Sequence, residues 1–316
     1  MCPFCFYFCI QIMLKTDMED KKSLAGAWVE AARPRTLPAS VSPVLLGCAL
    51  AYYDGMFDIT PAVLCLLVAL FAQIASNFAN DYFDFKKGAD REDRLGPERA
   101  VAQGWITPKA MLAGAFVMLG LACLSGLLLI CFADWRLIWV GLAIAICVLA
   151  YSAGPFPLAY NGLGDVCVLL FYGVIPVCFT YYIQTLSFSL LSFLLSVALG
   201  LLSVNILVVN NYRDYLQDKA ARKRTTIVLF GRRFGRGFYI LNECVAFLLV
   251  LPLVLDAPWW ILFLFGILFA LCFYTTRELL TLEGRALNRT LGHTARNVFL
   301  FAAVLSLLFV YVGSSL

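Results

Sequence analysis

Long apolar runs alternate with short polar stretches along almost the whole chain. Nine of these runs approach the roughly 20 mostly apolar residues that a transmembrane helix needs. They cover residues 37–53, 61–80, 109–131, 135–152, 165–184, 188–209, 237–255, 258–276 and 295–313. The first run is the shortest and contains Pro38 and Pro43, but polar residues bound it on both sides. The pattern therefore predicts an all-α, polytopic membrane protein with nine transmembrane helices.

The composition points to the same class of protein, because 62% of the 316 residues are hydrophobic and only 14% are charged. Charged residues make up roughly a quarter of an ordinary soluble domain, so we expect a lipid bilayer as the solvent. No polar linker divides residues 24–316, which we expect to form a single transmembrane domain after a cytoplasmic extension at residues 1–23. Met18 begins a more conventional opening sequence, and we expect translation to start there.

The basic residues test this arrangement of spans. In a nine-helix topology, 23 of the 24 Lys and Arg residues fall on one side of the membrane, and only Arg136 falls on the other. Positively charged loops stay in the cytoplasm. We therefore expect the N-terminus and the basic loops on the cytoplasmic side of the membrane, and the C-terminus outside.

The second apolar run leads into a first cluster of amides and carboxylates. Asn77 and Asp81 are four residues apart, and so are Asn80 and Asp84. Residues with this spacing share a helix face. Each pair therefore presents its oxygen atoms together at the cytoplasmic end of the helix, and Asp90 follows in the loop.

The sixth apolar run leads into a second cluster on the same side of the membrane. Asn210, Asp214 and Asp218 repeat every four residues. On a continuous helix they would form a stripe of about 12 Å. Basic residues that include Lys223 come directly after.

These residue types suit a magnesium-dependent diphosphate site. Mg²⁺ prefers oxygen ligands and usually binds one or two carboxylates together with substrate phosphates. Lys and Arg side chains nearby would hold the remaining phosphate oxygens, and the apolar helices would hold a long apolar tail. Solvated helix ends at the membrane surface are the plain alternative. Carboxylates at the C-terminal end of a helix oppose its macrodipole, however, and bound cations would offset that cost.

At these residues the sequence resembles the UbiA superfamily of intramembrane aromatic prenyltransferases. NDYFD at residues 80–84 is similar to the superfamily's first aspartate motif, and DYLQD at 214–218 to its second. The resemblance covers nearly all of residues 24–313, and it implies the nine-helix UbiA-like bundle. Further stretches resemble the branch that prenylates 1,4-dihydroxy-2-naphthoate: ARPRTLP at 32–38, KGAD at 87–90, RLGP at 94–97, YSAGPFPL at 151–158, GLGD at 162–165 and NNYRD at 210–214.

The sequence departs from the superfamily pattern at a few positions. Many members place a third carboxylate four residues after the second, whereas here Gly88 takes that place and Asp90 lies two residues further on, as in the naphthoate branch. Arg222 stands where a glycine commonly precedes Lys-Arg-Thr, which adds charge in the phosphate region. Ala220 and Ala221 replace the usual polar residues.

The resemblance implies transfer of a prenyl group from a polyprenyl diphosphate to the naphthoate, with loss of carbon dioxide, on the way to demethylmenaquinone. Two Mg²⁺ ions are expected as cofactors. The expected catalytic metal ligands are Asn80, Asp84, Asp214 and Asp218. Secondary candidates for the metal site are Asp81, Asn77, Asn210 and Asp90. Candidate diphosphate contacts are Arg213, Lys223 and Arg94, and Tyr151 and Asp165 are expected near the aromatic acceptor.

Three other interpretations stay open at this point. The acceptor could be another aromatic compound, such as 4-hydroxybenzoate, homogentisate or haem. An ion-coupled transporter could use the same carboxylates, although transporters tend to have broken helices and sites at the membrane midplane. A non-catalytic membrane scaffold would have no need of paired metal-ligand stripes. No nucleic-acid partner is expected.

Overall fold

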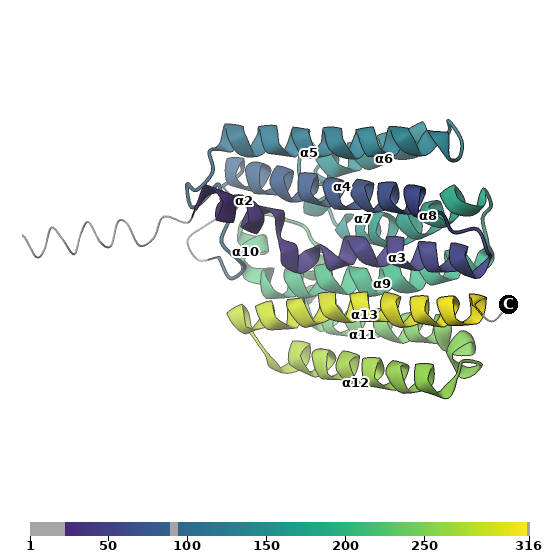
Figure 1. Ribbon diagram of the computed structural model, residues 1–316. Coiled ribbons are helices and arrows are strands. Elements are labelled where there is room, and N and C mark those ends of the chain that lie inside the picture. The colour runs from purple at the N-terminus through teal and green to yellow at the C-terminus, as the bar shows by residue number, and fades with distance from the viewer. Residues whose placement is uncertain (1–22, 89–93, 315–316) are drawn as a thin grey trace, which may run out of the picture.

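The computed structural model describes residues 23–88 and 94–314, and within these residues the chain is helical with no β-strand. Figure 1 shows the long helices lying side by side in one bundle. Twelve α-helices make up the bundle and its capping segments: α2 Leu24–Ala32, α3 Pro38–Tyr53, α4 Ile59–Lys86, α5 Pro108–Leu128, α6 Leu137–Ala150, α7 Gly164–Leu169, α8 Ile175–Thr185, α9 Leu190–Arg213, α10 Tyr215–Ala220, α11 Thr226–Leu255, α12 Trp259–Thr281 and α13 Leu287–Gly313.

Each of the nine predicted apolar runs is helical, but the count of nine membrane spans is not confirmed. Seven helical segments are long and apolar enough to cross a membrane, and α3 becomes an eighth only if it is joined to the Leu24–Thr36 segment, from which it bends by 53°. The 16 residues of α3 and the 14 of α6 span only about 24 Å and 21 Å. A hydrocarbon core is about 30 Å thick. The fold is therefore that of a multi-pass membrane protein with seven or eight full spans among the described residues.

Short polar side chains fix where several of the long helices begin. A Ser, Thr or Asp accepts a hydrogen bond from a backbone N–H in the first turn, which satisfies a donor that has no partner within the helix. Pro108 adds a backbone angle suited to the first helical position of α5. The residues that cap helices α4, α5, α9 and α11 in this way are Asp58, Thr107, Ser189 and Thr225.

Helix α9 lies at the centre of the bundle and packs against α3, α7, α8, α11 and α13. A π-helical turn at Leu170–Val174, between α7 and α8, also packs against α9. A Cβ on Gly173 in that turn would lie 2.5 Å from Gly200 Cα and 2.6 Å from the carbonyl oxygen of Ser196. Small residues let backbones approach closely where lipid gives no hydrophobic drive for association. This contact fixes α7, and therefore Asp165 at its start, against the central helix.

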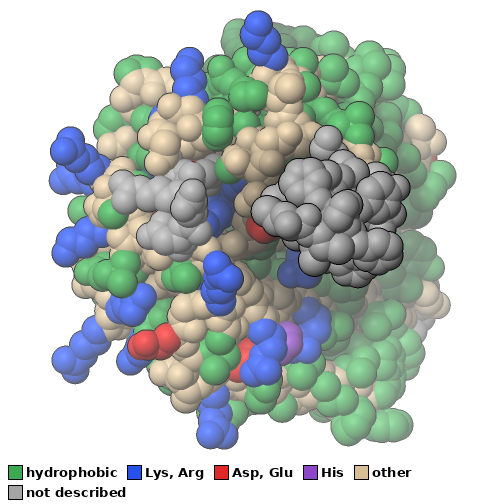
Figure 2. Space-filling view, turned by 90° about the vertical axis from the view of Figure 1, so that its left-hand side faces the viewer, with side chains coloured by type: hydrophobic (Ala, Val, Ile, Leu, Met, Phe, Trp, Pro, Cys, Tyr) green, Lys and Arg blue, Asp and Glu red, His purple; other side chains and the backbone are tan. Residues whose placement is uncertain are grey.

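The basic connections gather at one end of the bundle. Helix α2, the C-terminal ends of α4 and α9, helix α10 and the α12–α13 connection all lie at the left in Figure 1, whereas the C-terminus lies at the right. Figure 2, which views the left-hand end, shows many Lys and Arg side chains and few acidic ones on its surface. The structure thus places the basic segments together, as the pattern of charges predicted.

We expect Gly173→Ala to lower the thermal stability of the detergent-solubilised protein, because the new methyl group would overlap the backbone of α9. Overpacking of this kind costs about 1–3 kcal/mol. Thermal unfolding of Gly141→Ala provides the control, since a Cβ at Gly141 in α6 would meet nothing within 4 Å. Equal melting temperatures for the two variants would contradict a tight contact between the π-helical turn and α9.

Candidate active site at the basic end of the bundle

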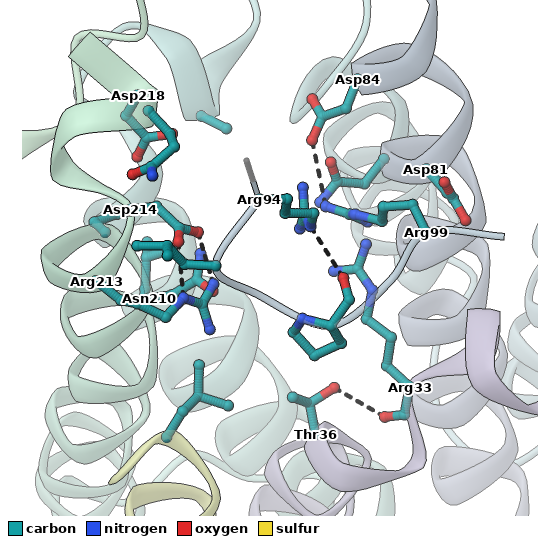
Figure 3. A pocket seen from close by; sticks show the side chains of 18 of the residues that line it. Arg33, Thr36, Asp81, Asp84, Arg94, Arg99, Asn210, Arg213, Asp214 and Asp218 are labelled. Carbon is teal, nitrogen blue, oxygen red and sulfur yellow. Dashed lines mark hydrogen bonds and ion pairs between the residues drawn. The ribbon is translucent and has the colours of Figure 1, made fainter. Parts of the chain in front are cut away.

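A polar cavity of about 550 Å³ opens at the basic end, between the C-terminal ends of α4 and α9. Figure 3 shows the aspartates of the two clusters on opposite sides of it. Its wall includes five aspartates from four parts of the chain: Asp81 and Asp84 of α4, Asp165 of α7, Asp214 at the end of α9, and Asp218 of α10. The two clusters that lie 130 residues apart in sequence therefore share one cavity.

Asp84 is the most heavily supported carboxylate of the first cluster, and it is 3% exposed. The hydroxyl of Tyr160 donates a hydrogen bond of 2.7 Å to its Oδ1. The guanidinium of Arg99 lies 3.4 Å from its Oδ2. Tyr160 comes from a 3₁₀ turn at Leu158–Tyr160 and Arg99 from the loop before α5, so two loops hold one carboxylate in place.

Arg213 organises the second cluster. It is 1% exposed, and its Nε and Nη2 donate to the two carboxylate oxygens of Asp214 at 2.7 and 2.6 Å. The same side chain donates to Asn210 at 2.8 Å and to Asn288 at 2.7 Å. A fork-to-fork pair of this kind fixes both position and orientation. The predicted diphosphate contact Arg213 thus holds the carboxylate and amide oxygens of its own cluster.

A glycine allows the loop after α4 to close over this arginine. A Cβ at Gly96 would lie 2.7 Å from Nη2 of Arg213. Asn288 also donates to the carbonyl oxygen of Leu95 at 2.9 Å, and the predicted diphosphate contact Arg94 donates to the carbonyl oxygen of Pro97 at 3.0 Å. The RLGP stretch therefore forms part of the cavity wall beside the second cluster.

The predicted stripe of the second cluster is bent rather than continuous. Helix α9 ends at Arg213, Asp214 has non-helical angles (φ −89°, ψ 13°), and α10 begins at Tyr215. Asp218 still donates its backbone N–H to the carbonyl oxygen of Asp214 at 2.8 Å. The expectation of one straight helical stripe was wrong, because the four-residue spacing also fits the end of α9 and the short helix α10 joined at Asp214.

Lys223 connects the two clusters across the cavity. Its ammonium lies 3.7 Å from Oδ2 of Asp84 and 3.7 Å from Oδ1 of Asp218. It also lies 4.7 Å from the centre of the Tyr160 ring, a distance at which a cation is attracted to the aromatic face. A positive charge therefore occupies a position between carboxylates of both clusters.

The other predicted site residues lie around the same region. Asn80 and Asn210 line the polar cavity, whereas Asn77 lines a neighbouring cavity and donates to the carbonyl oxygen of Ala32 at 2.9 Å. Asp81 is buried and accepts the backbone N–H of Ala100 at 3.1 Å. The predicted acceptor residues Tyr151 and Asp165 both line the polar cavity. The predicted ligand Asp90 lies outside the described residues.

Sequence reasoning missed several residues that shape the site. Arg99 and Tyr160 hold Asp84, and Asn288 connects Arg213 to the loop. None of the three belongs to a periodic pattern. Tyr160 does follow the YSAGPFPL stretch by two residues, which is the only signal that could have drawn attention to it.

A second, mostly apolar cavity of about 540 Å³ adjoins the first. Its wall includes residues of α3, α4, α5, α6, α7, α8, α9 and the π-helical turn. Seven residues line both cavities and so mark the junction between them: Arg33, Thr36, Asn80, Tyr151, Leu207, Asn210 and Leu291. A molecule with a charged head and an apolar tail could place one part in each cavity.

The side chains of the polar cavity suit magnesium better than a softer metal. Among the described residues, no group of three or more His, Cys, Asp or Glu side chains is close enough to hold a metal ion. The donors that do converge are carboxylate and amide oxygens, and Lys223 already marks a place for positive charge between two of them. Mg²⁺ typically takes few protein ligands and fills its remaining positions with water and phosphate, so the donor set fits this ion.

Comparison with known proteins identifies the family. Residues 40–301 match the UbiA prenyltransferase family. The chain belongs to the UbiA prenyltransferase family. The 1,4-dihydroxy-2-naphthoate octaprenyltransferase of Escherichia coli (strain K12) is 38% identical over 228 residues, which cover 70% of this chain and 74% of that protein.

Two further relatives agree with this assignment. The protein of the same name from Mycobacterium tuberculosis is 38% identical over 235 residues, covering 73% of this chain and 79% of its own. A UbiA homologue from Archaeoglobus fulgidus, solved with bound DMAPP and Mg²⁺, has the same fold with a TM-score of 0.59 at 18% identity, covering 87% of this chain and 99% of that one.

The departure from the UbiA pattern at Arg222 has a backbone cost. Arg222 has a φ of 58°, in the left-handed region that glycine adopts without penalty. Its side chain is exposed and does not line the polar cavity. The charge of Arg222 therefore does not belong to the cavity wall, and the position favours the glycine that is common there in the family.

Burial changes the acidity of Asp218, which lies in α10 outside the membrane-spanning helices. Burial raises the pKa of its carboxyl group from 3.8 to about 6; Lys223 lowers this pKa, the nearby carboxylates Asp214 and Asp84 raise it, and Arg213 lowers it. The folded protein therefore holds a proton on Asp218 at pH values where the unfolded chain has released it. The stability linked to this proton is fully present below pH 3.8 and is lost as the pH rises through about 6.

We expect metal-free Asp218→Asn to be more stable than the metal-free wild type above pH 6, because the variant buries no charge at this position. The difference is at most about 3 kcal/mol and should disappear near pH 4. Thermal unfolding in detergent with EDTA, measured from pH 4 to 8, tests this, with Glu283→Gln at an exposed site as the control. A constant difference across this pH range would contradict the raised pKa.

Arg222→Gly should raise the free energy of unfolding by about 0.5–1 kcal/mol. Glycine removes the steric strain of the left-handed conformation in the folded state, which outweighs the greater conformational entropy that it gives the unfolded chain. Lys219→Gly in α10 serves as the opposite control, because glycine within a helix costs about 1 kcal/mol. Chemical or thermal unfolding of both variants in the same detergent measures the two effects. Destabilisation by both substitutions would show that position 222 does not require a left-handed residue.

Proposed function

We propose that the protein transfers a polyprenyl group from a polyprenyl diphosphate to 1,4-dihydroxy-2-naphthoate, with loss of the carboxylate as carbon dioxide. The observation that carries the proposal is the pair of adjoining cavities, one lined by two oxygen-rich clusters and the other mostly apolar. Their shapes and chemistry match the head and tail of one amphiphilic substrate. The names of the relatives at 38% identity support the naphthoate as the acceptor.

The polar cavity would hold the diphosphate and its metal ions. Bound Mg²⁺, which we expect as two ions, would neutralise charge on the diphosphate as it leaves. The residues that we propose to hold the ions are Asn80, Asp84, Asp214 and Asp218, with Asp81, Asn77, Asn210 and Asp90 as secondary candidates. The Mg²⁺ and DMAPP bound to the Archaeoglobus homologue support a site of this kind in the shared fold.

The basic side chains of the cavity have different tasks in this proposal. Arg213 is committed to Asp214 and its neighbours, so it keeps that carboxylate in place. Lys223 has weaker contacts of 3.7 Å and could turn from the carboxylates to phosphate oxygens when the substrate enters. Arg94 lines the cavity from the loop after α4 and is the third candidate for binding the diphosphate.

The apolar cavity would hold the prenyl chain and protect the reacting carbon. Breaking the bond between the allylic carbon and the diphosphate oxygen leaves an allylic cation, which water would quench. An apolar wall excludes that water. The electron-rich ring then attacks from the junction of the two cavities, where Tyr151 lies and beside which Asp165 lines the polar cavity.

The charge distribution supports an orientation with the site on the cytoplasmic face of a bacterial inner membrane. The segments that carry most Lys and Arg residues lie at the end of the bundle that contains the polar cavity. Positively charged loops are retained in the cytoplasm. Both the diphosphate head group and the naphthoate carry negative charge and would lie on that side.

Purified protein in detergent or membranes should convert a polyprenyl diphosphate and 1,4-dihydroxy-2-naphthoate to the prenylated, decarboxylated product, detected by mass. The reaction should require Mg²⁺ and stop with EDTA. Asp84→Asn and Asp214→Asn should each lower the rate by about 100-fold or more, because they remove charge where the leaving group is stabilised. Glu283→Gln, an exposed substitution in the α12–α13 connection, should leave the rate unchanged.

The same assay with 4-hydroxybenzoate in place of the naphthoate tests the choice of acceptor. Product from 4-hydroxybenzoate alone would retain the metal-dependent prenyl transfer and refute the naphthoate assignment. Prenylation of neither compound by folded protein would refute the proposed activity. Proton- or sodium-driven uptake in vesicles would then favour the transporter alternative.

A further inference from the structure

Asp165 has one carboxylate oxygen that receives no hydrogen bond from any residue in 23–88 or 94–314. It is the second residue of α7, it lines the polar cavity, and only 8% of it is exposed. The hydroxyl of Thr226 donates to its Oδ2 at 2.6 Å. Its Oδ1 is buried and has no hydrogen-bond partner among the described residues. Leaving such a group unpaired costs more than an ordinary hydrogen bond gains.

The cations that pair with the other carboxylates do not reach Asp165. Lys223 lies between Asp84 and Asp218, and Arg213 is bound to Asp214. An ionised carboxylate only accepts hydrogen bonds. Oδ1 therefore provides a place for an O–H or N–H donor of a bound molecule. A role for Asp165 in binding the diphosphate or a metal ion is less well supported, because the proposed metal-binding clusters lie elsewhere in the cavity wall.

Asp165 also lies close to where the two cavities meet. The Tyr151 hydroxyl lies 3.7 Å from the position of a Cβ on Gly164, and Tyr151 lines both cavities. Cys167, two residues after Asp165, lines the apolar cavity. An aromatic ring placed at this junction would have the allylic carbon of the prenyl chain on one side and Asp165 on the other.

We propose that Asp165 accepts a hydrogen bond from the ring hydroxyl next to the carboxylate-bearing carbon of the aromatic acceptor, and that it takes up this proton as the new carbon–carbon bond forms. This inference rests on the proposed function. The diphosphate leaves first with the electrons of the broken C–O bond. As the ring O–H bond then breaks, its electrons move into the ring, and the ring carbon bonds to the allylic cation. The ring product is a ketone whose neighbouring carbon carries both the prenyl group and the carboxylate.

The same residue returns the proton in the second half of the reaction. The carboxylate of this β-keto acid leaves as carbon dioxide, and the electrons of the broken C–C bond form an enolate. Asp165 then protonates the enolate oxygen, which restores the ring hydroxyl and the ionised Asp165. Thr226, which donates to Oδ2, keeps Oδ1 directed at the substrate and acts as a positioning residue.

The expected effect of Asp165→Asn is specific to the acceptor. At pH 7 the variant should lose about 100-fold in kcat/KM for the naphthoate, the lower end of the range for a general base. The KM for the prenyl diphosphate should stay within about twofold, since the metal-binding clusters are intact. Thr226→Val keeps the carboxylate and should lose less than about tenfold.

The pH dependence distinguishes proton transfer from a structural role. When the base is absent, the rate should depend on spontaneous ionisation of the ring hydroxyl, so the defect of Asp165→Asn should shrink as the pH is raised from 7 to 9. The titratable groups that interact electrostatically with Asp165 are Tyr151 at the end of α6 and Cys167 on its own helix. Tyr160 lines the cavity from the 3₁₀ turn. Tyr151→Phe and Cys167→Ser in the Asp165→Asn background should leave this recovery with pH unchanged.

Three results would count against the inference. If the wild type is active and the rate of Asp165→Asn lies within threefold of the wild-type rate, the role of Asp165 is refuted and the proposed function stays intact. An equal loss toward both substrates, with no recovery at pH 9 and a lowered melting temperature, would show that Asp165 is structural. Absence of product from the wild type would refute the proposed function, and the inference with it.

Discussion

Four carboxylates from two distant helix ends share one partly desolvated cavity, and their mutual repulsion has to be offset within the protein before a substrate arrives. In a medium of lower dielectric than water, like charges a few ångströms apart repel strongly. The structure offsets this repulsion with one cation for each cluster and one between them: Arg99 contacts Asp84, Arg213 holds Asp214, and Lys223 lies between the clusters. The loops that carry these groups therefore have to fold back over the helix ends.

This constraint explains why the connecting segments at the basic end are ordered against the cavity. Asp81 turns away from the second cluster and accepts the backbone N–H of Ala100, which anchors the second half of the α4–α5 connection. Asn288, at the start of α13, joins the same connection to Arg213. Removing one member of a buried charged pair leaves the other uncompensated and costs several kcal/mol. The charged groups of the site are thus structural supports as well as candidate ligands.

The parts of the fold that the sequence predicted well are those with a local cause. Apolar run length located every long helix, and the four-residue spacing of Asn80 and Asp84 was correct because both lie in the unbroken α4. Run length was a poor guide to span length in α6, because the predicted segment 135–152 included four residues that lie outside the 14 helical ones. The break in the helix at Asp214 was also not predictable, because the four-residue spacing of Asn210, Asp214 and Asp218 fits a continuous helix and a broken one equally well.

The candidate site was predictable only on the helices that carry its carboxylates. Arg99 and Tyr160 reach Asp84 through tertiary contacts from two loops, and neither spacing nor composition distinguishes them from other loop residues. The left-handed backbone conformation of Arg222 was likewise not predictable from spacing or composition, although the glycine common in the family did mark the position. The spacing of residues in the sequence reveals side chains that share a helix face. Residues that loops bring into contact can be recognised only in the folded structure.

The junction of the two cavities decides where chemistry can occur in such an arrangement. A charged head held between the two clusters and a tail held among apolar helices fix an amphiphile at both ends, so the bond that joins head to tail has to lie near the residues common to both walls, such as Asn80, Tyr151 and Asn210. Orientation of this kind removes translational and rotational freedom before the reaction. Asp165 lines the wall beside that junction, and in the proposed mechanism it receives the ring proton there, away from Arg213 and Lys223, which pair with other carboxylates. The separation of charge from apolar surface that lets the chain reside in a membrane thus also defines the position of its reactive centre.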